Sequence, residues 1–146
     1  MGYGVNYPGA VIPRSVQGII YALHTHAGVP HELLEWHGHN DFYKAVVNSS
    51  TAWLYGCSGV NTSLFGIGER TGNTPLEAMV FEYAQLRGTL NGMDTRVITE
   101  LAEYYEKEIG YHIPPRTPFV GKNFNVTRAG IHADGHIEVF ADKRCS

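Results

Sequence analysis

Only two segments of the 146-residue sequence have the pattern of β-strands, and a helical pattern follows each of them. The first strand-like segment runs from Leu33 to His37 and the second from Gly59 to Phe65. Strands that alternate with helices predict parallel strands in an α/β fold. Two parallel strands alone do not make a stable sheet that is covered on both faces. We therefore expect part of a larger α/β fold, or a chain that associates to complete its sheet.

The expected helices follow from apolar periodicity and from the residues that start and end helices. One helix is expected from Pro13 to about Ala27, and a second from Phe42 to about Tyr55 with Asp41 as its N-cap. The third, over residues 74–87, opens with Thr-Pro-Leu-Glu, a capping box with proline at the first helical position. The last is capped by Asp94 and ends at Gly110.

The composition is that of a globular protein, with 43% hydrophobic and 17% charged residues and a formal net charge of -3. Acidic and basic residues are interspersed, so nucleic acid is not an expected partner. No apolar run is long enough to cross a bilayer and the N-terminus lacks the features of a signal peptide, so a membrane partner is not expected either. Cys57 and Cys145 form no CxxC pair, which favours a reducing cytoplasm.

His37 and His39 stand at the end of the first expected strand, on either side of Gly38. In extended backbone, residues two apart point to the same face, so both imidazoles can bind one metal ion. The carboxyl ends of parallel strands are also where active sites of α/β proteins lie. The alternative is a pair of core or surface histidines without a ligand, which this spacing alone does not exclude.

A second pair with the same spacing, His24 and His26, lies in the first expected helix. Two positions along a helix correspond to a rotation of about 200°, so these side chains diverge. We expect a surface or packing role for them and no shared metal ion.

The segment Gly66–Asn73, GIGERTGN, follows the second expected strand. It lacks the third glycine and the lysine of phosphate-binding motifs, so it is a poor match to a phosphate loop. Glu69 either forms a structural ion pair with Arg70 or is a polar group of the site. Asn73 carries a side-chain oxygen that can reach a cation, but by itself it reads as a turn residue.

Three motifs, HGHND, GIGERTGN and AGIHADG, occur in this order and together resemble the acyl-CoA-dependent aldol-type condensing enzymes. That family comprises the synthases of 2-isopropylmalate, homocitrate, citramalate and, by the Re route, citrate. The longer stretches HGHNDFYKAVVNSS and GIGERTGNTPLEAMVFEY look most like the Re-citrate type. The resemblance covers nearly the whole chain.

The resemblance implies a (β/α)₈ TIM barrel followed by helical subdomains. A complete barrel takes about 250 residues, so this chain is expected to contain only part of one. Leu33–His37 would be strand seven, and Val60–Phe65 would be strand eight. Residues 1–92 would then form the C-terminal part of the catalytic barrel, and residues 93–146 a helical linker and the start of a subdomain.

By the same resemblance, a divalent metal is held by His37, His39 and Asn73, and Mn²⁺, Co²⁺, Mg²⁺ and Zn²⁺ all suit such ligands. The family's strand-one carboxylate ligand has no matching segment here. His132 of the AGIHADG motif is implied to be catalytic in a partner subunit's site, so a homodimer is expected; the alternative is a capping or surface histidine. Glu69 is the second catalytic candidate.

The implied reaction condenses acetyl-CoA, the co-substrate, with a 2-oxo acid. Oxaloacetate, giving citrate, is favoured over 2-oxoisovalerate and 2-oxoglutarate. The metal would stabilise the alkoxide formed when the enolate of acetyl-CoA attacks the ketone. Two alternatives are a metal-dependent carbon-carbon lyase or carboxyltransferase on a related barrel, and a truncated piece without turnover.

We predict that the chain associates in solution, because exposed edges of parallel strands invite pairing. Light scattering at micromolar concentration measures the mass of the particle directly. A dimer or a larger assembly is expected, and a clean monomer would contradict the prediction.

Overall fold

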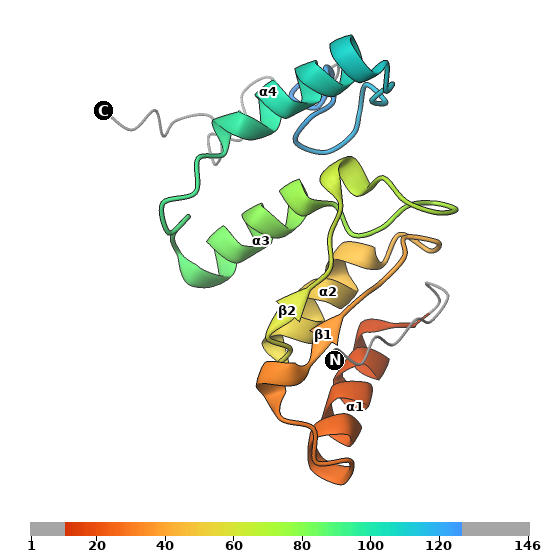
Figure 1. Ribbon diagram of the computed structural model, residues 1–146, viewed down its shortest axis with the longest axis vertical. Coiled ribbons are helices and arrows are strands. Elements are labelled where there is room, and N and C mark those ends of the chain that lie inside the picture. The colour runs from red at the N-terminus through yellow and green to blue at the C-terminus, as the bar shows by residue number, and fades with distance from the viewer. Residues whose placement is uncertain (1–10, 127–146) are drawn as a thin grey trace, which may run out of the picture.

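The computed structural model describes residues 11–126. Its helices are α1 (Pro13–Tyr21), α2 (Ala45–Leu54), α3 (Leu76–Arg87) and α4 (Arg96–Tyr104), and its strands are β1 (Glu35–Trp36) and β2 (Gly59–Val60). Figure 1 shows α1, α2 and the two strands at one end of an elongated molecule, with α3 next to them and α4 at the other end. None of the helices in residues 11–126 is long and apolar enough to cross a membrane.

The two strands pair in parallel, with Glu35 opposite Gly59 and Trp36 opposite Val60. This confirms the expected partial α/β arrangement, but the strands are shorter than expected. Residues 31–33 form a 3₁₀ turn before β1, and Leu64–Gly66 form another in the segment expected to extend β2. Phe65 has φ +55°, which no strand allows. With only two paired residues in each strand, the hydrogen bonds between β1 and β2 are few, and the packing of the helices supports the sheet.

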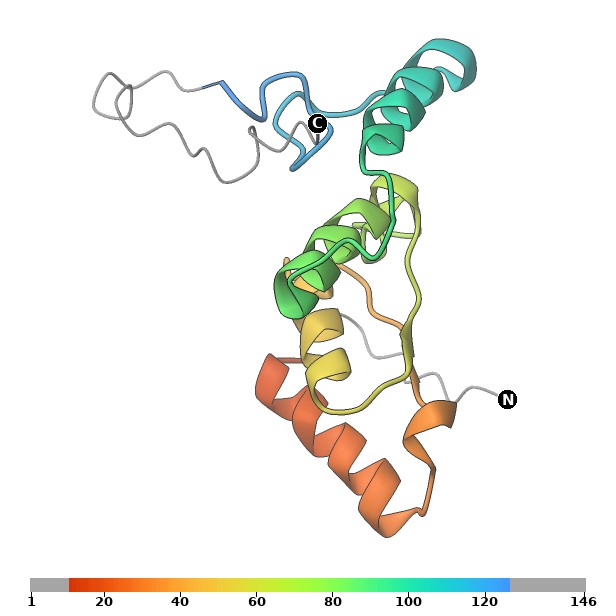
Figure 2. The same cartoon turned by 90° about the vertical axis from the view of Figure 1, so that its left-hand side faces the viewer.

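The hydrophobic core lies between the sheet and the helices α1 and α2, which cover the same side of the strands in Figure 2. Val16 and Ile20 of α1 are 0% and 2% exposed, and burial of such side chains contributes about 1.5–3 kcal/mol each. The buried residues of this core are Val16, Ile20, Leu34, Trp36, Ala52 and Cys57. Burial raises the pKa of the Cys57 thiol to about 11, so this cysteine is a protonated packing residue at neutral pH.

The side of α2 that faces α3 and the start of the described chain is polar. Ser49 Oγ lies 2.9 Å from Thr74 Oγ1, and Asn48 Nδ2 donates to the carbonyl of Val11 at 2.8 Å. Ser50 Oγ donates to Glu82 of α3 at 2.5 Å. These hydrogen bonds satisfy polar groups that would be costly to bury unpaired, and they fix α2 against its neighbours.

The expected starts of α2 and α3 are wrong. Asp41 does not cap α2, which begins three residues later than Phe42, because Tyr43 has φ +56°; the Asn40 side chain accepts the N–H of Ala45 at 3.3 Å instead. Thr74 does not cap α3 either, since its hydroxyl is buried against Ser49 and Ala45, and Pro75 holds the N-cap position.

The expected helix ends are confirmed. Gly28, Gly88 and Gly110 have φ of +68°, +70° and +72°, the left-handed conformation in which glycine ends helices. Short π-helical segments, Ala22–His26 and Tyr105–Ile109, extend α1 and α4 to these glycines. At the start of α4 the N-cap is Thr95 and not the expected Asp94, whose side chain accepts the N–H of Arg96 at 3.0 Å.

Aromatic contacts attach the C-terminal part of the described chain to the rest. The ring of Phe65 meets Tyr105 edge to face at 5.1 Å between centroids, and Phe81 of α3 stacks on Phe119 at 4.4 Å. Lys122 forms an ion pair with Glu106 at 2.9 Å. The expected boundary at residues 92 and 93 stays a prediction.

Substitution of Glu77 tests whether its side chain holds the turn after β2. Its side chain accepts the N–H of Phe65 at 3.1 Å and the residue is 4% exposed. We expect Glu77→Ala to lower the free energy of unfolding in urea by about 1–3 kcal/mol, because the part-buried N–H of Phe65 loses its acceptor. A Glu77→Ala variant as stable as the wild type would contradict this.

The pH dependence of the same site gives the control. Burial raises the pKa of the Glu77 carboxyl above its ordinary value. The folded state therefore holds this proton more tightly than the unfolded state, and the contribution of Glu77 to stability falls as the pH rises above 4.5. Glu77→Gln keeps an acceptor without a charge, so its stability relative to the wild type should be higher at pH 7 than at pH 4. An unchanged difference would contradict the role of burial.

Candidate metal centre

The segments that follow β1 and β2 lie side by side. His39 pairs with Asn73 in an isolated antiparallel bridge, and the N–H of Asn40 donates to the carbonyl of Gly72 at 2.9 Å. Both segments leave the same edge of the sheet because β1 and β2 are parallel. The HGHND and GIGERTGN motifs, about thirty residues apart in the sequence, therefore form one site.

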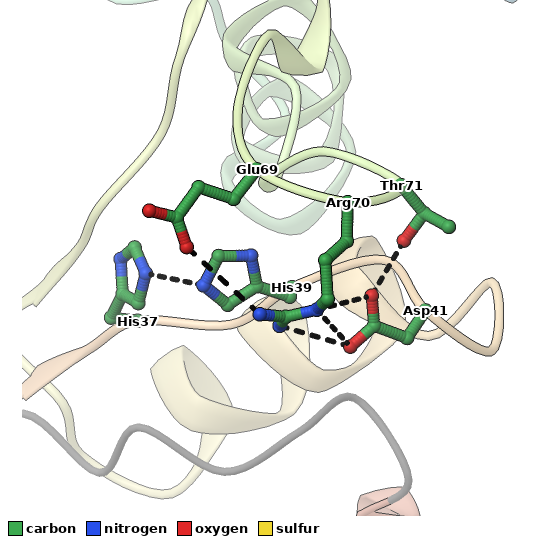
Figure 3. Close-up of polar contacts among 6 residues, drawn as sticks. All are labelled: His37, His39, Asp41, Glu69, Arg70 and Thr71. Carbon is green, nitrogen blue, oxygen red and sulfur yellow. Dashed lines mark hydrogen bonds and ion pairs between the residues drawn. The ribbon is translucent and has the colours of Figure 1, made fainter.

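His37 and His39 point toward each other from extended backbone, as Figure 3 shows. Their Nε2 atoms are 3.3 Å apart and their ring planes cross at 82°. Two nitrogens that share an ion at the usual zinc distance of about 2.0–2.1 Å stand roughly 3 Å apart at tetrahedral or octahedral angles. The spacing of two residues thus predicted the convergence of the rings correctly.

Burial and the neighbouring His39 both lower the pKa of His37, with burial the larger cause. The lowered pKa favours the neutral imidazole, which is the form that binds a metal ion. His39 is 6% exposed, and its Nδ1 atom has no hydrogen-bond partner among the described residues.

Gly38 has a packing reason to stand between the histidines. A Cβ at this position would lie 2.9 Å from Nε1 of the Trp36 indole, which is itself buried in the core. The indole therefore fills the space below the site, and only glycine allows the backbone to pass over it.

Asn73 faces the same side of the bridge as His39, because residues directly opposite each other in an antiparallel pair project from one face. Its Oδ1 atom is buried and has no hydrogen-bond partner within residues 11–126, while Nδ2 makes only a 3.4 Å contact with the carbonyl of Ile67. A buried acceptor left unpaired costs about 1–3 kcal/mol, a cost that a bound cation would remove. The amide fits tightly over Gly68, where a Cβ would lie 2.5 Å from Nδ2.

The second histidine pair behaves as its helical position predicts. His24 donates through Nδ1 to the carbonyl of Val29 at 3.0 Å and stacks on His31, whereas His26 packs against Tyr21. The two side chains take different partners and share no site.

Glu69 and Arg70 form only a long contact of 4.0 Å, and the Glu69 side chain is 84% exposed. The stronger partner of Arg70 is Asp41, whose carboxylate it contacts at 3.0 and 3.1 Å. Sequence reasoning missed this pair, because no local signal links two residues that lie 29 positions apart. The structure thus places Glu69 at the site's rim, with its carboxylate in solvent.

Within residues 11–126, no three His, Cys, Asp or Glu side chains are grouped closely enough to hold a metal ion. Of the three metal ligands expected from the sequence, the structure thus brings the two histidines together and adds the neutral amide of Asn73 through the bridge. His132 lies outside the described residues.

The sequence matches the HMGL-like family over residues 7–104. The chain belongs to this family. Its relatives include citrate (Re)-synthase of Clostridium kluyveri, 68% identical over 92% of this chain and 30% of the relative, and citrate (Re)-synthase of Syntrophus aciditrophicus, 59% identical over 94% and 22%. Homocitrate synthase 1 of Nostoc is 34% identical over 89% of this chain and 34% of the relative. The chain thus spans about a third or less of the length of these curated relatives.

The chain also superposes on part of the fold of solved structures. The HMG-CoA lyase of Bacillus subtilis superposes with a TM-score of 0.64 and 25% identity, covering 79% of this chain and 39% of the lyase. An HMG-CoA lyase of Acinetobacter baumannii in complex with coenzyme A and 3-methylmalate gives a TM-score of 0.63 at 21% identity. The superposition covers 77% of this chain and 38% of that lyase. The described chain is thus a partial α/β unit of the TIM-barrel fold of this family.

Gly72 offers a test of the turn that carries Asn73. It has φ +96°, and an added Cβ would collide with the carbonyl oxygen of Gly66. Gly28 is the matched control, because it has φ +68° with nothing within 4 Å of the added atom. Gly28→Ala should cost about 1–2 kcal/mol from the left-handed backbone alone.

We expect Gly72→Ala to lower the free energy of unfolding by clearly more than Gly28→Ala, since the collision adds to the same backbone penalty. Urea unfolding followed by circular dichroism measures both. Equal losses in the two variants would show that the turn is loose.

Proposed function

We propose that this chain provides the metal-binding, C-terminal part of the barrel of an acyltransferase that condenses acetyl-CoA with a 2-oxo acid. The observation that carries the proposal is the approach of His37 and His39 to 3.3 Å, together with the bridge that pairs His39 with Asn73, whose Oδ1 has no hydrogen-bond partner among the described residues. The identity of 68% to a citrate (Re)-synthase supports oxaloacetate as the 2-oxo acid. The overall reaction is then acetyl-CoA, oxaloacetate and water to citrate and CoA.

The ligand set proposed for the metal is His37, His39 and Asn73. Neutral imidazoles and an amide oxygen suit Mn²⁺, Co²⁺, Mg²⁺ or Zn²⁺. A divalent ion bound there supplies Lewis acidity toward the ketone oxygen of the substrate. The remaining ligand would be the carboxylate of the family's first strand, for which this chain has no matching segment.

The proposed proton-transfer groups are Glu69 and His132. Glu69 belongs to the same turn as Asn73, and its exposed carboxylate is free to meet a substrate at the rim. His132 would act in the site of a partner subunit, so the proposed enzyme is a homodimer. A base in either position removes a proton from the methyl group of acetyl-CoA.

The proposed place of the chain in the barrel is strands seven and eight for β1 and β2. Residues 1–92 would belong to the barrel, and residues 93–146 to a helical linker and the start of a subdomain. The chain is proposed to act in the cytoplasm.

A second candidate is a metal-dependent carbon-carbon lyase, favoured by the TM-scores of 0.63–0.64 with HMG-CoA lyases. The higher identity to the citrate (Re)-synthases ranks condensation first. Assays of the full-length protein in both directions separate the two, since a lyase would cleave a 3-hydroxyacyl-CoA and form no citrate.

We predict that His37→Ala and His39→Ala abolish Co²⁺ binding by the chain, measured by isothermal titration with the metal alone. Loss of a direct ligand should weaken affinity at least as much as the roughly 10–100-fold seen for outer-shell partners. His24→Ala is the control, because it has the same spacing to its neighbour but lies in a helical segment. Equal losses in all three variants would contradict a specific site.

We also predict that the 146-residue chain alone releases no CoA from acetyl-CoA and oxaloacetate with added Mn²⁺. The described residues lack an acidic metal ligand near the histidines, and the chain spans 30% of the C. kluyveri relative. A thiol-reactive dye detects CoA, with a sample lacking acetyl-CoA to subtract Cys57 and Cys145, and the relative as positive control. Robust release by the chain alone would refute the prediction.

A further inference from the structure

We propose that Asp41, Arg70 and Thr71, here termed the Asp41 latch, are positioning residues for the metal ligands. The latch ties the turn that carries Asn73 to the segment that carries His39. This inference rests on the proposed metal site and adds to it residues that do not touch the metal.

The latch is a set of short, charge-assisted contacts. Arg70 Nε donates to both carboxylate oxygens of Asp41 at 3.1 Å, and its terminal nitrogen lies 3.0 Å from Oδ2. Thr71 Oγ1 donates to Oδ1 at 2.8 Å. Figure 3 shows both side chains reaching down from the turn to Asp41. The Asp41 side chain is only 15% exposed, so these contacts are partly shielded from water and stronger than those of a typical surface pair.

The latch stands next to the ligands on both segments. Asp41 follows His39 by two residues, and Thr71 precedes Asn73 by two. Between these pairs lie the His39–Asn73 bridge and the hydrogen bond from Asn40 to Gly72. An isolated bridge defines its register weakly, and a slip of one residue would turn His39 to the opposite face. A carboxylate held by two consecutive residues of the turn fixes that register.

The backbone of the turn agrees with this role. Arg70 has φ +54°, an unfavourable conformation for a residue other than glycine. Such strain persists where surrounding contacts impose it, and it clusters at ligand sites. In this conformation the guanidinium lies 3.0 Å from the Asp41 carboxylate and 4.0 Å from that of the neighbouring Glu69.

A second Asp–Arg pair in the chain supplies a matched control. Asp94 and Arg96 are 2.7 Å apart at the start of α4, but their side chains are 46% and 86% exposed. They are two residues apart and connect no separate segments. Asp94→Asn therefore removes the same chemistry without touching the site.

The test is isothermal titration of the 146-residue chain with Co²⁺ alone. Asp41→Asn and Arg70→Gln should each weaken the affinity about 10-fold, the low end of the range for outer-shell partners. The double variant should be no weaker than the worse single variant, because both break one contact. Asp94→Asn should bind as the wild type does.

A role limited to stability is excluded by two further readouts. The imidazole NMR signals of His37 and His39 in the Co²⁺ complex should shift in the latch variants and not in Asp94→Asn. Thr71→Ser keeps the hydroxyl donor and should bind Co²⁺ as the wild type does, whereas Thr71→Val loses the donor and should bind it more weakly. If Asp41→Asn unfolds, this threonine pair, which leaves all charges in place, decides the question.

Each result has one meaning. A wild-type chain that binds no Co²⁺, or a His39→Ala variant that binds it equally well, would overturn the metal site itself. Binding that depends on His39 but is unchanged in Asp41→Asn and Arg70→Gln would overturn only the latch. Equal affinities in Thr71→Ser and Thr71→Val would likewise count against it.

Discussion

The parallel pairing of β1 with β2 is the constraint on which the candidate site depends. Because the strands run in the same direction, both of their carboxyl ends open onto one edge, and the segments that follow can meet in the His39–Asn73 bridge. The core sets this geometry from below, since Leu34 and Trp36 are buried against α1 and α2. A site formed from two distant motifs thus needs only four paired strand residues, provided the helices hold them.

The charge of the proposed metal ligands bears on how the site would be completed. Two imidazoles and an amide would bring no negative charge to a divalent cation, so acidic ligands from the rest of the protein or from the substrate would favour its binding. Asp41 is the acidic side chain that follows the histidines most closely, yet Arg70 and Thr71 engage both of its oxygens. Asp41 therefore joins the two segments through Arg70 and Thr71, and in the proposed site coordination would be left to the histidines and Asn73.

Local sequence patterns predicted the helices, the parallel order of the strands and the convergence of His37 with His39, because these follow from periodicity and from backbone geometry. Two of the errors occur where a side chain bonds to a distant residue instead of its expected local partner. Asp41 binds Arg70 instead of capping α2, and the Thr74 hydroxyl packs against Ser49 instead of capping α3. The early end of β2 was missed for another reason, since the left-handed turn at Phe65 is held by the buried carboxylate of Glu77.

X-ray absorption spectroscopy of the Co²⁺-loaded chain tests the central claim most directly, because imidazole rings give a distinct outer-shell scattering pattern. The account predicts two imidazole nitrogens at about 2.1 Å, with oxygen donors in the remaining positions. Scattering from oxygen alone, or from a single imidazole, would contradict it.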